Sequence, residues 1–158
     1  MTAEGVITQP TFDDIQQTLI RSVMDRIIPP DQEFPGAGEL GVANYIDGIA
    51  AGSEDLKYLF DHGLSRIEAR AQERWSTGFV AMHGEQKDGV LREIEVDEPD
   101  FFEELVRHTY NGYYTDPTII ARLGLEVRPP QPLGYDLEPG DLTLLENVKK
   151  RGRMYREV

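Results

Sequence analysis

The sequence predicts an all-α protein: a single compact multi-helix domain with long proline- and glycine-rich loops and an extended C-terminal segment. Three observations support this prediction. Apolar residues recur every three or four positions through most of the chain, which is typical of amphipathic helices. Prolines and glycines cluster between these stretches. A length of 158 residues is enough for one domain with a real core, and no internal repeat indicates a second domain.

The first helix is expected over residues 11–28. Thr11 is placed to cap it. Asp14, three residues later, takes the capping-box position that usually holds the longer Glu or Gln. Pro29 and Pro30 end it, since proline cannot continue a helix. Its apolar face at helical spacing is Phe12, Ile15, Leu19, Val23 and Ile27.

An ordered surface loop should follow the two prolines, because the stretch up to Gly41 is dense in turn-forming residues. Gly36, Gly38 and Gly41 match the letters of the dinucleotide fingerprint G-x-G-x-x-G. That fingerprint needs a buried strand before its turn. Here a helix and two prolines precede it, so we interpret these glycines as a plain turn with Gly41 ahead of a helix.

The next two helices meet at a tight joint. One begins near Val42, Gly52 ends it, and Ser53 is expected to cap the following helix. From Ser53 one apolar stripe continues for about six turns and forms the longest periodic pattern in the chain. Its members are Leu56, Leu59, Phe60, Leu64, Ile67, Ala71 and Trp75.

Residues 79–96 fit one interrupted helix or, from Val90 to Val96, a short alternating strand, and we favour the helix. Asp97 and Pro99 then predict the start of a helix that reaches about Tyr114.

Near the C-terminus, one or two turns are expected over 117–123. The stretch 127–140 is too rich in proline and glycine for regular structure and is expected to lie over the body. Asp141 should cap a last helix over 142–151.

Charge argues against several partner classes. Asp and Glu number 29 against 16 Lys and Arg, giving a formal charge of -13, which repels nucleic acid and anionic membranes. Positive charge gathers only near the C-terminus. The chain has no cysteine, and no apolar stretch is long enough to cross a membrane, so we expect no direct membrane insertion.

No complete catalytic or metal-binding set is evident. His62, His83 and His108 lack the Glu-x-x-His and paired-histidine spacings of helical metal sites, so no metal is expected. Two alternatives stay open: a hydrolase that uses His108 with Glu104 or Asp116, and a ligand-binding helical domain.

The stretch 108–117 crowds three tyrosines, a histidine and a glycine at one helix end. Gly112 is expected to cap that helix, with partly buried rings around it. Tyrosine suits cores and interfaces alike, because it joins apolar area to a hydroxyl group.

Two segments resemble the gluconate 2-dehydrogenase subunit 3 family. They are FFEELVRHTYNGYYTDP at 101–117 and MDRIIPPDQEFPGAGELGVANYIDGIAAG at 24–52, and Gly134–Tyr135 matches a later landmark. The resemblance places the family core at 10–136 and leaves 137–158 as a C-terminal helix and basic tail. That tail looks most like small subunits of glucoside 3-dehydrogenases.

The resemblance implies a non-catalytic small subunit that assists the folding, stability or export of a large flavoprotein. That partner would be a glucose-methanol-choline-type (GMC-type) sugar dehydrogenase carrying FAD and the catalytic histidine, while this chain binds no cofactor. In this class electrons often pass to a cytochrome c. The candidate interface residues are His108, Tyr110, Tyr113, Tyr114, Trp75, Arg151, Arg153 and Tyr155.

Export is an open point. Many family members carry a twin-arginine signal, and neither an Arg-Arg pair nor an apolar segment precedes Phe12. The expectation is therefore either a cytoplasmic complex, a trimmed start, or a partner that carries the export signal.

Overall fold

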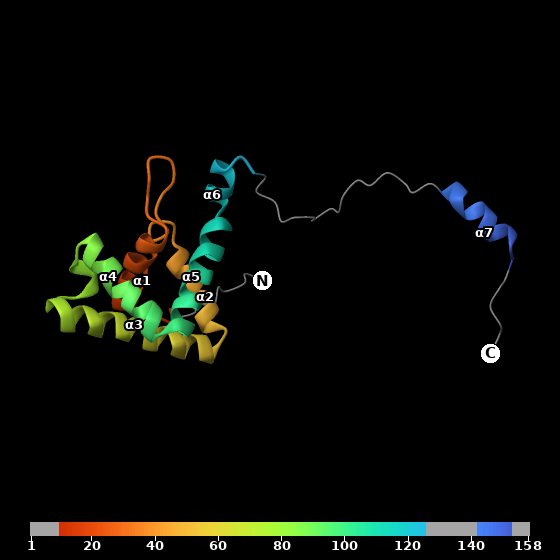
Figure 1. Cartoon of the computed structure of the whole chain (residues 1–158). Coiled ribbons are helices and arrows are strands. Elements are labelled where there is room, and N and C mark those ends of the chain that lie inside the picture. The colour runs from red at the N-terminus through yellow and green to blue at the C-terminus, as the bar shows by residue number, and fades with distance from the viewer. Residues whose placement is uncertain (1–9, 126–141, 153–158) are drawn as a thin grey trace, which may run out of the picture. The chain divides into compact units, whose positions relative to one another are not determined.

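The computed structural model describes residues 10–125 and 142–152, and Figure 1 shows the whole chain. The chain divides into two compact units, Met1–Val127 and Arg128–Val158, which are considered separately below. The described residues of the first unit, 10–125, are called the body. All regular elements of the described residues are helices, which confirms the all-α prediction.

Helix α1 spans Asp14–Ile27. Its cap is Asp13, whose carboxylate accepts a hydrogen bond from the backbone N–H of Gln16 at 2.8 Å. In return, the side-chain oxygen of Gln16 accepts from the backbone N–H of Asp13 at 3.1 Å. The predicted cap at Thr11 is therefore wrong by two residues. Thr11 instead donates its amide to the Asp47 carboxylate of α2 at 3.1 Å and so holds the chain before α1 in place.

The loop between α1 and α2 is ordered around acidic side chains. The Asp31 carboxylate accepts from the amides of Glu33 and Phe34, and these two hydrogen bonds lower the pKa of Asp31. The Gly38 amide donates to the Asp25 carboxylate of α1 at 2.8 Å. The glycine turn thus binds a carboxylate of its own chain, and the interpretation of the fingerprint as a plain turn is confirmed.

Helices α2, Val42–Ala51, and α3, Glu54–Trp75, meet as predicted at Gly52 and Ser53. The Ser53 hydroxyl accepts from the Leu56 amide at 3.3 Å. Gly41 precedes α2 with a φ of +70°, which favours glycine.

The ambiguous segment is helical, and the strand alternative is wrong. It divides into the 3-10 helix η1, Phe79–Ala81, and α4, Gly84–Asp97. Helix α5, Pro99–Tyr114, follows without a loop: Asp97 ends α4, so Glu98 rather than Asp97 occupies the cap position of α5. The short helix α6, Pro117–Arg122, is capped by Asp116.

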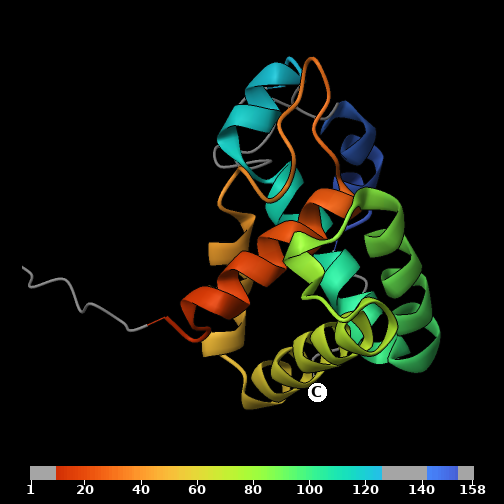
Figure 2. The same cartoon turned by 90° about the vertical axis from the view of Figure 1, so that its left-hand side faces the viewer.

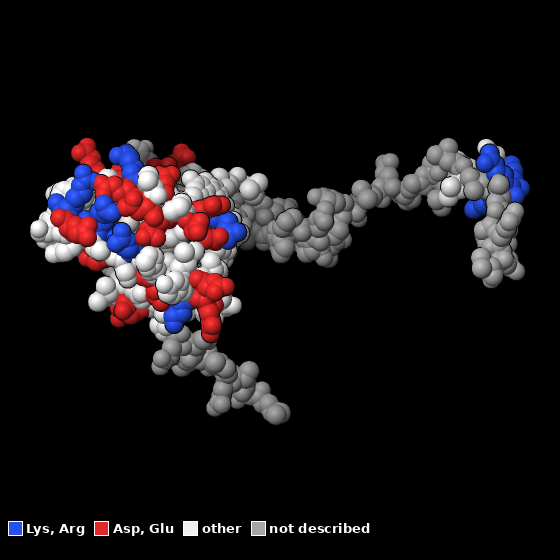
Figure 3. Space-filling model, turned by 60° about the horizontal axis from the view of Figure 1, so that its bottom comes forward, with Lys and Arg blue, Asp and Glu red and all other residues white. Residues whose placement is uncertain are grey.

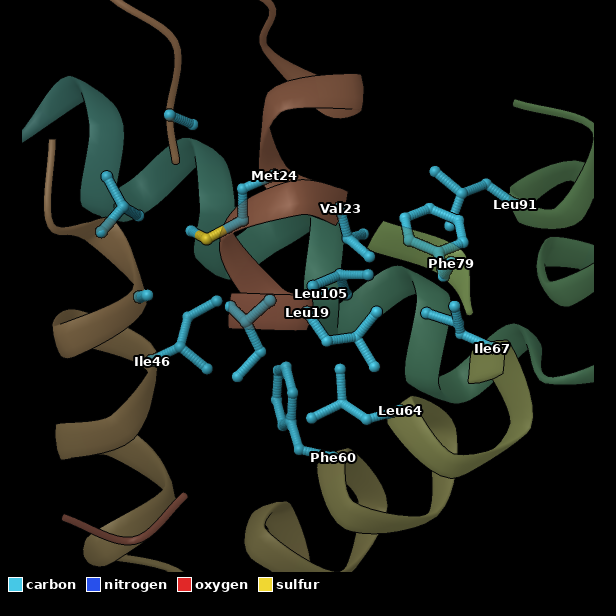
Figure 4. Packing of buried hydrophobic residues seen from close by; sticks show 14 of the residues in the cluster. Leu19, Val23, Met24, Ile46, Phe60, Leu64, Ile67, Phe79, Leu91 and Leu105 are labelled. Carbon is cyan, nitrogen blue, oxygen red and sulfur yellow. The ribbon is translucent and has the colours of Figure 1, made fainter. Parts of the chain in front are cut away.

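The core lies around α1, which contacts α2, α3, α4, α5 and η1 (Figure 2). Figure 4 shows side chains of α1, α2, α3, α4 and α5 meeting there. Its largest fully buried side chains are Phe12, Phe60, Phe79, Phe101, Ile20, Met24, Ile46, Leu64, Ile67, Ile94, Leu105 and Ile119. Ile15, which the helical spacing places on the apolar face of α1, is 79% exposed.

In the second unit the described residues form the 3-10 helix η2, Leu142–Leu145, and α7, Glu146–Lys150. The predicted single helix over 142–151 therefore begins with a 3-10 turn, as α-helices often do. The predicted cap Asp141 and the stretch 127–140 lie outside the described residues. No helix among the described residues has both the length and the apolar character needed to cross a membrane.

Candidate partner-binding surface

Helix α5 crosses α2 very closely at Gly112. A Cβ atom at this position would lie 2.5 Å from Val42 Cγ1 and 2.9 Å from Tyr45 Cδ1, so only glycine fits. The expectation that Gly112 caps the helix is therefore wrong. Helix α5 continues to Tyr114, and the glycine serves the contact between the two helices. This contact fixes the rotation of α5 and hence the direction of its tyrosines.

Tyr113 anchors α5 to the loop that follows α1. Its side chain is buried, and its hydroxyl donates to the Pro35 carbonyl oxygen at 2.9 Å. Burial raises the pKa of Tyr113, so the phenol stays a hydrogen-bond donor. The structure thus places Tyr113 beneath the surface.

His108 is also enclosed, with only 8% of the residue exposed. Its Nε2 atom lies 3.1 Å from Glu104 Oε2, yet neither ring nitrogen has an aligned hydrogen bond or contact with solvent. Burial lowers the pKa of His108, the charge of Arg107 adds to this, and Glu104 opposes it. The His108 ring is therefore kept neutral, and it packs against the Tyr45 ring with the two centroids 6.2 Å apart.

The hydrolase alternative finds no support in this arrangement. Both nitrogens of His108 are closed off, whereas a general base must reach the proton that it abstracts. The Asp116 carboxylate accepts from the Thr118 amide at 2.8 Å and caps α6. Glu104 also pairs with Arg107.

Tyr110 and Tyr114 are the two tyrosines of α5 that reach the surface. They are 43% and 50% exposed, and their rings stack with centroids 6.0 Å apart and planes 16° apart. Glu103 and Arg107, also exposed, precede them at helical spacing, so the four side chains share the outer face of α5.

A shallow groove adjoins each ring. Tyr110 borders one of about 340 Å³ with Ile27 and Val106, and Tyr114 borders one of about 170 Å³ with Ile28 and Phe34. We call Tyr110, Tyr114 and these two grooves the tyrosine surface. It presents apolar area and phenol groups on an otherwise acidic protein.

Of the other predicted interface residues, Trp75 does not line either groove of the tyrosine surface. Trp75 ends α3, is half-buried against the core, and has the Arg74 guanidinium 5.1 Å from its ring centroid. In Figure 1 that end of α3 lies far from α6. Arg151 is exposed in the second unit, while Arg153 and Tyr155 lie outside the described residues.

Elsewhere on the body, several charged side chains of α3 and α4 pair with each other. Arg70 of α3 contacts Glu93 and Asp97 of α4 at 3.1 and 2.6 Å, and Arg66 contacts Glu98 at 3.0 Å. Figure 3 shows basic and acidic side chains interspersed over one face. Within residues 10–125 and 142–152, no group of three or more His, Cys, Asp or Glu residues is arranged to hold a metal ion.

Sequence reasoning missed a third groove, of about 690 Å³, between α1, α3 and η1. Exposed Ile15 lies on its rim. Helical periodicity placed Ile15 on the apolar side of α1, but periodicity cannot tell whether another element covers that side.

Comparison with known proteins identifies the family. The family model described as Gluconate 2-dehydrogenase subunit 3 matches residues 14–136, well over half of the chain. No curated protein and no solved structure matches. The family name denotes one subunit of a multisubunit dehydrogenase complex. The chain belongs to the gluconate 2-dehydrogenase subunit 3 family.

Proposed function

We propose that this chain is a non-catalytic accessory subunit that binds the large catalytic subunit of an FAD-dependent, GMC-type sugar or glucoside dehydrogenase through the tyrosine surface. The family match over 14–136 carries the proposal. Binding supports the folding, stability or export of the partner. The FAD and the transfer of electrons to an acceptor such as cytochrome c belong to that partner.

The two exposed rings of the tyrosine surface are of a type found in interface cores, and charged side chains line part of the groove beside Tyr110. Tyrosine is enriched among the residues that dominate binding energy, because it buries a large apolar area with few rotatable bonds. Tyr110 and Tyr114 are already held by stacking, and Tyr114 also meets the edge of buried Tyr113 at 5.2 Å. Little conformational entropy is therefore lost when a partner covers them.

The charge distribution supports a protein partner. The net charge of -13 disfavours nucleic acid and anionic membranes. Lys149, Lys150 and Arg151 are exposed at the end of α7 and can pair with acidic groups of a partner. Such pairs at the rim of an interface speed association more than they strengthen the complex.

Co-expression with a candidate FAD-dependent, GMC-type flavoprotein from the same genome tests the proposal. We expect the two chains to co-purify, and the flavoprotein to lose solubility or dehydrogenase activity when this chain is omitted. Replacing both Tyr110 and Tyr114 with Ala should reduce co-purification. The matched control is Tyr58→Ala, since Tyr58 of α3 is 74% exposed and also stacks on a ring, that of His62. A flavoprotein equally soluble and active alone, which never co-purifies, would contradict the proposal.

A further inference from the structure

The groove between α1, α3 and η1 is larger than either groove of the tyrosine surface. Apolar side chains make most of its wall, with Leu19 and Leu64 as its floor, and Figure 4 shows these two meeting in the core. Its full lining is Asp14, Ile15, Gln16, Thr18, Leu19, Leu64, Ser65, Glu68, Gly78, Val80 and Ala81. Its volume of about 690 Å³ is ample for several side chains of a binding partner.

Ile15 shows that this wall lacks a cover. It precedes Leu19 by four residues and so lies on the same side of α1, yet it is 79% exposed whereas Leu19 is 6% exposed. Across the groove, Val80 of η1 is 45% exposed. The apolar side of α1 thus continues beyond the point where the body covers it.

Hydrogen bonds between elements hold the groove open. The Glu68 carboxylate of α3 accepts from the Phe79 amide of η1 at 3.1 Å, and a Cβ at Gly78 would lie 2.6 Å from Glu68 Oε1. The Gln16 side chain of α1 donates to the Asp61 carboxylate of α3 at 2.8 Å. These contacts fix α1, α3 and η1 relative to each other, so the groove loses little conformational entropy when a partner binds.

Charge and backbone chemistry indicate the occupant. The charged lining residues are Asp14 and Glu68, with no Lys or Arg among them, so a basic segment is favoured. Apart from the first-turn amides of α1, the wall residues of α1 and α3 have backbone groups that are bonded within their own helices. An incoming chain must therefore satisfy its own backbone groups, as a helix does.

The groove and the tyrosine surface lie at opposite ends of α1, since residues 14–19 line the former and Ile27 and Ile28 border the latter. We infer that the groove receives an amphipathic helix of the catalytic subunit whose apolar face is flanked by Lys or Arg. This inference rests on the proposed function and gives the partner a second point of contact.

The test is the affinity of the purified chain for the flavoprotein, measured by calorimetry. Ile15→Lys should weaken binding by at least about tenfold, since it replaces an apolar contact with a charge. Val96→Lys is the matched control, because Val96 of α4 is 77% exposed and lies outside the groove lining. This variant should bind as the wild type does.

The charge of the groove is tested separately. Asp14→Asn should weaken binding at low salt, whereas Asp100→Asn, in the first turn of α5, should not.

A benzophenone crosslinker at position 15 identifies the occupant. We expect it to label a helical segment of the flavoprotein that contains Lys or Arg.

Equal affinities of the Ile15→Lys and Val96→Lys variants would overturn the inference and leave the proposed function standing. A wild-type chain that does not bind the flavoprotein would overturn both. A self-associated chain that Ile15→Lys converts to monomers would assign the groove to a second copy and also overturn the inference.

Discussion

Replacing Gly112 with Ala tests the close crossing of α2 and α5 that orients the tyrosine surface. The added Cβ would lie 2.5 Å from Val42 Cγ1 and 2.9 Å from Tyr45 Cδ1. Val42 is buried and β-branched, so its side chain cannot rotate away easily. Overpacking of this kind costs about 1–3 kcal/mol of the free energy of unfolding. The higher helix propensity of alanine returns up to about 1 kcal/mol.

Gly48 in α2 supplies the matched control. It also lies inside a helix, but a Cβ there would meet nothing within 4 Å. Gly48→Ala should therefore stabilise the chain by up to about 1 kcal/mol. Because the gain in helix propensity is common to both variants, the difference between their stabilities isolates the overpacking at Gly112.

We expect that difference to be about 2 kcal/mol, with Gly112→Ala less stable than the wild type. Urea unfolding followed by far-ultraviolet circular dichroism measures both variants. If the two substitutions change the free energy of unfolding equally, α5 does not cross α2 as closely as described, and the orientation of Tyr110 and Tyr114 loses its basis.

Two further predictions concern the residues beneath the surface. Tyr113→Phe removes the hydrogen bond to the Pro35 carbonyl and should cost about 1 kcal/mol in urea unfolding; an unchanged midpoint would contradict that bond. The pKa of His108 is lowered from 6.5 in the folded chain, so the unfolded chain binds more protons below that pH. Stability should be complete above about pH 6.5 and fall as the pH drops below it. The His108→Gln variant should lose this component, and an identical pH profile of the two proteins would refute the assignment.

Much of the fold follows from local patterns. Ser53 caps α3 as predicted, because it is a short polar side chain ahead of a periodic stretch. Asp116 caps α6, where only one or two turns without a cap are predicted. The start of α1 is predicted two residues early, at Thr11, because threonine and Asp13 are both suitable cap residues. The contact between Thr11 and Asp47, 36 residues away, decides between them.

The candidate surface was predictable only in part. The crowding of tyrosines at 108–117 identified the right helix end, but composition cannot separate Tyr113, which is 3% exposed, from Tyr114, which is 50% exposed. Their burial depends on the rotation of α5, which the contact at Gly112 sets from a distant helix. The groove beside Ile15 was missed for the same reason, since an uncovered face is a property of tertiary packing.

The central claim, that this chain binds a catalytic flavoprotein through the tyrosine surface, is tested most directly by the dissociation constant of the purified pair. Truncating residues that dominate an interface typically costs about 2 kcal/mol or more, roughly a thirtyfold loss of affinity. We predict at least that loss for the variant with Ala at both Tyr110 and Tyr114, and little change for Tyr58→Ala. Equal affinities of the wild type and the double variant would contradict the claim.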